Sequence, residues 1–166
     1  MRIGVVTSRW NAEVTEKLEE GALNYLEELT GIEIIAVKVP GAVEIPIACQ
    51  SLLENGCEGV VALGCVIRGD TTHYDYVCQS VERGVSQLML QYKKPIGFGV
   101  LTTENDEQAL DRAGGKHGNK GFEAAQVTVE MIGLLKGLQS DLAKPKKATA
   151  KKRPSPLKKT KKKAKK

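Results

Sequence analysis

The side chains best suited to chemistry are crowded into one short stretch, GCVIRGDTTHYDY at positions 64–76. An apolar run precedes this stretch and a helical pattern follows it, so its polar residues occupy a strand-to-helix turn. The start of a helix presents unpaired backbone N–H groups and the positive end of the helix dipole, which favours a phosphate or another anion. His73 can exchange a proton near neutral pH. The turn therefore indicates anion binding beside proton transfer.

Three neighbours of His73 strengthen this interpretation. Arg68 and the hydroxyl groups of Thr71 and Thr72 are expected to add hydrogen-bond donors to the same anion site. An isolated histidine is more often a capping or core residue than a catalytic one. Among these donors, however, His73 is better explained as an acid–base group, because such groups cluster with anion donors in strand-to-helix turns.

The second histidine, His117, lies in a glycine-rich loop with two lysines, AGGKHGNKG at positions 113–121. The loop looks like a phosphate-binding loop, but it lacks the G-x-x-x-x-G-K-[ST] spacing and follows a helical pattern instead of a strand. No predicted strand ends in G-x-G-x-x-G either. The sequence therefore gives no support to a nucleotide-dependent mechanism.

The elements that must position this turn follow a simple alternation. Apolar runs rich in Val, Ile and Leu predict four strands, at positions 2–7, 32–39, 59–66 and 95–102. Helical patterns occupy positions 11–29, 44–55, 74–92, 106–113 and 121–142. This order predicts an α/β fold, a flavodoxin-like three-layer α/β/α sandwich with a four-stranded parallel sheet. Ligands of such sheets bind outside the carboxyl ends of the strands.

Two other predicted strand ends carry candidate residues. Trp10 follows the first strand and could stack on a flat heterocycle, although a single tryptophan is more often a packing residue. The turn at 40–42 follows the second strand, and its glycine lets backbone N–H groups approach a ligand. Glu44 stands at the next helix start, where it binds a ligand or only complements the helix dipole.

Length and cysteine usage limit the class of protein. A chain of 166 residues fits one domain, and its four cysteines lie in or beside apolar runs without a C-x-x-C pair. We expect reduced core thiols and no metal site. The N-terminal apolar stretch is too short for a signal peptide, and no run of about eighteen apolar residues is present, so the sequence predicts a cytoplasmic protein without a membrane partner.

The basic residues are unevenly distributed along the chain. The segment 144–166 contains 13 of the 25 Lys and Arg residues and no acid, which leaves 12 basic against 20 acidic residues, a charge of −8, in 1–143. With one large aliphatic residue and no aromatic one, this segment is predicted to be a disordered Lys-rich tail after a catalytic domain at 1–143. The tail either lies over the acidic body of its own assembly or binds nucleic acid or another polyanion.

Five motifs together resemble the lumazine synthase family. They are WN at 10–11, VPGAVEIP at 39–46, GCVIRGDTTHYDY at 64–76, FGVLTTEN at 98–105 and GNKG at 118–121. The resemblance implies a transferase of the penultimate step of riboflavin biosynthesis. In that step 5-amino-6-(ribitylamino)uracil condenses with 3,4-dihydroxy-2-butanone 4-phosphate to 6,7-dimethyl-8-ribityllumazine, with release of phosphate and water. It implies no metal, nucleotide or covalent cofactor.

The resemblance also implies roles for individual residues. His73 matches the family's proton donor and acceptor, and Trp10 the aromatic residue that stacks on the pyrimidine. The resemblance implies that the ribityl chain and ring contact Ala42, Val43 and Glu44. The pyrimidine would contact Cys65, Val66 and Ile67, and the phosphate would contact Asp70, Thr71 and Arg112. The charge of Asp70 suits a cap on the helix start better than a contact with the ligand.

The family's sites lie between subunits. The resemblance therefore implies a homo-oligomer, either a homopentamer or a shell of sixty subunits, in which Phe98 contributes a wall to the site of a neighbouring subunit. The alternative function is that of an α/β module whose basic tail makes a weak contact with nucleic acid or another polyanion.

Overall fold

A single parallel sheet forms the centre of the chain in the computed structural model, which describes residues 1–143. Its strands, in the spatial order β2-β1-β3-β4, are β1 (Arg2–Ser8), β2 (Glu33–Val39), β3 (Gly59–Ile67) and β4 (Ile96–Thr103). Every neighbouring pair is parallel. The four predicted strands are thus confirmed, with ends that differ by a single residue. The tail at 144–166, for which the sequence predicts disorder, lies outside the described residues.

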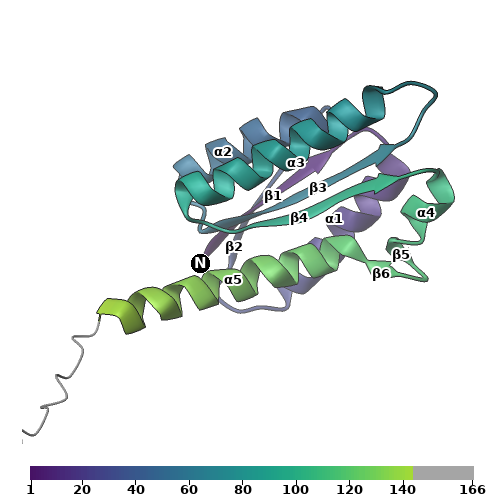
Figure 1. Cartoon of the computed structure of the whole chain (residues 1–166). Coiled ribbons are helices and arrows are strands. Elements are labelled where there is room, and N and C mark those ends of the chain that lie inside the picture. The colour runs from purple at the N-terminus through teal and green to yellow at the C-terminus, as the bar shows by residue number, and fades with distance from the viewer. Residues whose placement is uncertain (144–166) are drawn as a thin grey trace, which may run out of the picture.

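Helices cover both faces of this sheet (Figure 1). They are α1 (Ala12–Glu27), the short 3₁₀ helix η1 (Ala42–Glu44), α2 (Ile45–Glu54), α3 (His73–Tyr92), α4 (Asp106–Leu110) and α5 (Lys120–Ala143). The α2 and α3 helices pack on one face, and α1 and α5 on the other. The predicted flavodoxin-like sandwich is confirmed.

The burial of β3 explains why the strands are apolar without alternation. Val61 and Leu63 pack in the cluster under α1 and α5, while Val60 and Ala62 pack under α2 and α3. All four side chains are fully buried. Because helices cover both faces, neither set of alternating positions faces water, and both sets are apolar.

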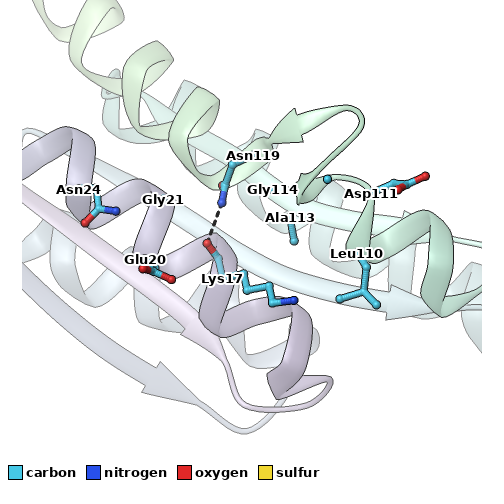
Figure 2. Close-up of a pocket in the computed structure, with 10 residues that line it drawn as sticks. Lys17, Glu20, Gly21, Asn24, Leu110, Asp111, Ala113, Gly114 and Asn119 are labelled. Carbon is cyan, nitrogen blue, oxygen red and sulfur yellow. Dashed lines mark hydrogen bonds between the residues drawn. The ribbon is translucent and has the colours of Figure 1, made fainter.

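The glycine-rich loop contains structure that the sequence pattern did not indicate. Two short strands, β5 (Ala113–Gly115) and β6 (Gly118–Asn119), pair antiparallel as a hairpin. The Asn119 side chain then joins the hairpin to two helices: its Oδ1 accepts from the Gly121 N–H at 2.8 Å, and its Nδ2 donates to the Lys17 carbonyl at 2.8 Å. Figure 2 shows the bond from Asn119 to Lys17 beside a cavity, of about 530 Å³, between α1 and the hairpin.

The α5 helix packs directly on the backbone of β4. A Cβ atom at Gly97 would lie 2.1 Å from the carbonyl oxygen of Ala124 and 2.3 Å from the Thr128 hydroxyl. Both distances are far below van der Waals contact, so only a residue without a side chain permits this approach. The position of α5 along the sheet therefore depends on Gly97.

The cysteines behave as the sequence predicts. Cys49, Cys57 and Cys65 are buried free thiols, and Cys78 is a half-buried one. In the part of the chain that the structure describes, no helix is long and apolar enough to cross a membrane.

Candidate active site

The carboxyl ends of the strands meet at one edge of the sheet, next to the start of α3 (Figure 1). Trp10 follows β1 at this edge, and its backbone N–H donates to the Pro40 carbonyl after β2 at 3.3 Å. Its ring lies against Gly41, where a Cβ atom would come within 3.0 Å of Cε3. The side chain is still 68 % exposed. The indole is thus supported from one side and open on the other, as an aromatic platform for a flat ring requires.

Asn11 holds this platform in place, and sequence reasoning assigned it no role of its own. Its backbone is left-handed, with φ of 59°, and its Nδ2 donates to the Cys65 carbonyl at 2.8 Å. The bond joins the end of β1 to the end of β3. Asparagine tolerates left-handed backbone better than most residues, which was the available signal.

The turn after β2 is held by Glu44. Its Oε2 accepts from the Gly41 N–H at 2.9 Å, which closes the turn as in a capping box. Glu44 thus stabilises the start of η1 through Oε2, while its Oε1 makes no hydrogen bond within residues 1–143. Ala42 is buried under the turn, while Val43 is 48 % exposed at the edge.

The end of β3 lies beside the end of β1, on the side away from β2. Cys65 is buried, and Val66 and Ile67 are half-buried. Burial, with a smaller contribution from the charge of Asp106, raises the pKa of the Cys65 thiol to about 12. The thiol therefore stays protonated near neutral pH and acts as an apolar wall.

The turn between β3 and α3 presents the predicted anion-binding groups to solvent. Asp70, Thr71 and His73 are exposed, and His73 is the first residue of α3. Its N–H donates to the Thr71 Oγ1 at 3.3 Å, whereas the Thr72 side chain makes no capping bond. Thr71, and not Asp70, therefore accepts the first N–H group of α3. Within the described chain the Asp70 carboxylate has no hydrogen bond or ion pair.

Arg68 does not join these anion donors. Its guanidinium forms ion pairs with Asp75 at 3.2 Å and with Glu104 at 2.9 Å. It also lies over the Tyr74 ring, 4.0 Å from the ring centroid. The side-chain bonds to these carboxylates raise the pKa of Arg68. The guanidinium that the sequence offers as a donor to the anion site thus already binds two carboxylates from other elements.

Phe98 and Arg112 lie in a different concavity. Both line a groove of about 630 Å³ along the outer edge of β4, together with Lys120. Phe98 pairs with Ala62, four residues before the Val66–Thr102 pair. Phe98 therefore lies roughly 13 Å along β4 from the carboxyl ends of the strands. The groove lining includes neither Trp10 nor His73. The chain thus carries the predicted site residues as two separate surfaces.

The first surface combines an aromatic platform, an apolar floor and a helix start with an acid–base residue. We call these residues the strand-end surface, which consists of Trp10, 42–44, 65–67 and 70–73. We call the second surface the β4 groove.

Comparison with known proteins identifies the family. A family model described as 6,7-dimethyl-8-ribityllumazine synthase matches residues 1–136. A protein of that name from Bdellovibrio bacteriovorus is 74 % identical over 134 residues, which cover 81 % of this chain and 75 % of the relative. Proteins of the same name from Desulfovibrio desulfuricans and Cytophaga hutchinsonii are 46 % and 47 % identical, over 83 % and 78 % of this chain and 90 % and 83 % of their own lengths. The chain therefore belongs to the 6,7-dimethyl-8-ribityllumazine synthase family.

Proposed function

We propose that the chain condenses 5-amino-6-(ribitylamino)uracil with 3,4-dihydroxy-2-butanone 4-phosphate on the strand-end surface. The observation that carries this proposal is the position of His73, which starts α3 at the edge where Trp10 stands open on one face. The pyrimidine stacks on Trp10 and lies over Cys65, Val66 and Ile67. The ribityl chain follows the turn at 42–44, where Oε1 of Glu44 can accept from a hydroxyl group.

The phosphate ester binds at the start of α3. Asp70 and Thr71 contribute backbone N–H groups there, and the dipole of a 20-residue helix adds to the attraction. The Asp70 carboxylate points into solvent in this arrangement. Arg112 adds a positive charge from the β4 groove of another subunit. Together these groups neutralise the phosphate before it leaves.

The reaction requires proton transfers that His73 can perform. The amine of the pyrimidine attacks the ketone, and the resulting imine forms with loss of water. A proton is then removed as the phosphate leaves, and the resulting enol tautomerises to a carbonyl at the carbon that carried the hydroxyl group. Attack of the ribitylamino nitrogen on this new carbonyl closes the ring with loss of water. Close positioning of the two substrates and a nearby acid–base group lower the barriers of these steps. Cys65 takes no covalent part, because its thiol is protonated.

A complete site requires two copies of the chain. Phe98 and Arg112 lie in the β4 groove, away from the strand-end surface of the same chain, and β4 is the edge strand of the sheet. A neighbouring copy would bring its groove against the strand-end surface. We infer a closed ring, a homopentamer at least, that works in the cytoplasm.

A turnover assay tests the proposal. The purified chain is mixed with both substrates, and the fluorescent lumazine is followed over the spontaneous background. We expect H73A to lower kcat by about a hundredfold, as for a lost acid–base group. The matched control is H117A, which removes the exposed histidine of the hairpin and should leave the rate unchanged. Product formation no faster than the background would overturn the proposal.

The charge distribution supports a second, subsidiary role for the segment 144–166. This segment has 13 basic residues and no acid, next to a body of charge −8. A salt-sensitive contact with nucleic acid or another polyanion follows from such a charge. A chain of residues 1–143 should keep its turnover, as expected if these residues form the catalytic domain, and should lose any RNA binding seen at low salt. Equal RNA binding by both chains would exclude this role.

A further inference from the structure

The turn that carries Thr71 and His73 has few contacts of its own. Gly69 is exposed and has open space around the position of a Cβ atom. Within residues 1–143, the single hydrogen bond that a side chain of this turn makes is the one that Thr71 Oγ1 accepts from the His73 N–H. The path of this turn is therefore determined by the residues that fix its two ends.

Arg68 fixes both ends. Its backbone N–H donates to the Thr103 carbonyl at 2.9 Å, which ties the end of β3 to the end of β4. Its side chain forms two ion pairs, from Nη2 to Asp75 in the first turn of α3 and from Nε to Glu104 directly after β4. The three elements that border the turn thus converge on one side chain.

The shape of the arginine head group makes this convergence possible. A planar guanidinium can hold two carboxylates in separate directions and stack on an aromatic ring at once, whereas a lysine ammonium is a point charge without a fixed fork. The Tyr74 ring, 4.0 Å from Cζ, occupies the remaining flat face. Single exposed ion pairs contribute little, but several charges on one rigid group restrict each other's freedom.

We propose that Arg68 is a positioning residue for the condensation, which sets where Thr71 and His73 stand by holding Asp75 on α3 and Glu104 after β4. This inference rests on the proposed function. Loosening the turn should weaken phosphate binding and proton transfer, which occur at the turn. It should leave the stacking of the pyrimidine on Trp10 intact, because Asn11 and Gly41 hold that platform independently.

Steady-state kinetics of R68Q and R68K test this inference. Misplacement of a reacting group by about 1 Å can cost up to about a hundredfold in rate, so we expect R68Q to lower kcat about tenfold. We also expect its KM for the phosphate-bearing ketone to rise about tenfold, while the KM for the pyrimidine changes less than about twofold. R68K should fall between R68Q and the unchanged protein. The matched control is R83Q, which removes an exposed arginine of α3 that has no ion pair within residues 1–143.

A double-mutant cycle and a binding measurement separate positioning from general damage. Because Arg68 acts through Glu104, E104Q should add nothing to the loss already caused by R68Q. Inorganic phosphate, titrated by calorimetry as an activity-independent probe, should bind R68Q about tenfold more weakly than R83Q. Kinetic constants of R68Q equal to those of R83Q, or an equal rise of both KM values, would overturn the inference while the proposed function stands. A wild-type chain without turnover would overturn the proposed function instead, and equal phosphate affinities of R68Q and R83Q would then reject the positioning role as well.

Discussion

A mixed-subunit experiment tests the division of the site into two surfaces. One variant, W10A/H73A, loses the platform and the acid–base group of the strand-end surface but keeps its β4 groove. The other, F98A/R112A, loses the groove residues and keeps the strand-end surface. Each variant alone should be almost inactive, because every site in its assembly lacks one half.

The expected recovery follows from the geometry. Phe98 lies roughly 13 Å along β4 from the carboxyl ends of the strands in its own chain, so we expect the two surfaces of one chain to serve different sites. In a ring with randomly mixed subunits, a site works when its strand-end surface comes from F98A/R112A and its groove from W10A/H73A. With equal amounts of the two variants, this combination occurs in about a quarter of the sites of a closed ring.

The assay follows lumazine fluorescence after the two variants are unfolded together in urea and refolded as a mixture. We expect about a quarter of the wild-type rate, against almost none for each variant treated alone. Mixing without unfolding is the control, because intact assemblies cannot exchange halves. A refolded mixture as inactive as its components would refute the shared site, and so would full activity of F98A/R112A by itself.

Three further predictions concern stability and charge. Burial raises the pKa of the Cys49 and Cys65 thiols from 9.0 to about 12, so the folded chain keeps protons that the unfolded chain releases above pH 9. The two buried thiols therefore stabilise the folded chain fully below pH 9, and this contribution is lost between pH 9 and 12. The free energy of unfolding measured in urea should be about 3 kcal/mol lower at pH 10 than at pH 8. Equal free energies at the two pH values would contradict the burial of these thiols. G97A forces a Cβ atom to within 2.1 Å of a backbone carbonyl of α5 and should lower the free energy of unfolding by about 3 kcal/mol. G137A has open space around the new Cβ atom and should raise the free energy of unfolding by about 1 kcal/mol. A higher melting temperature for G97A than for G137A would contradict this packing of α5 on β4. D70N removes an unpaired carboxylate beside the phosphate and should lower the KM for the ketone about fivefold at low salt, an effect that a rise in KM would disprove.

Local sequence pattern was sufficient to predict the fold class and which residues lie on the strand-end surface. Apolar runs without alternation can be buried only in a sheet covered on both faces, and parallel strands end at a common edge. Residues that follow these strands, such as Trp10 and His73, therefore lie at the same end of the sheet. Likewise, cysteines within apolar runs had to be buried. These conclusions depend on local pattern, and the structure agrees with them.

The separation of the two surfaces and the contacts that hold them follow from long-range packing. The packing of the segments after β4 brings Arg112 into one groove with Phe98, and no local pattern encodes that arrangement. The partners of Arg68 come from two other elements, so a residue that looked like an anion donor became a link between carboxylates. Asn119 similarly bonds Lys17 across 102 positions. Contacts between residues so far apart in sequence depend on the packed arrangement of the helices and strands, which is set by the whole chain.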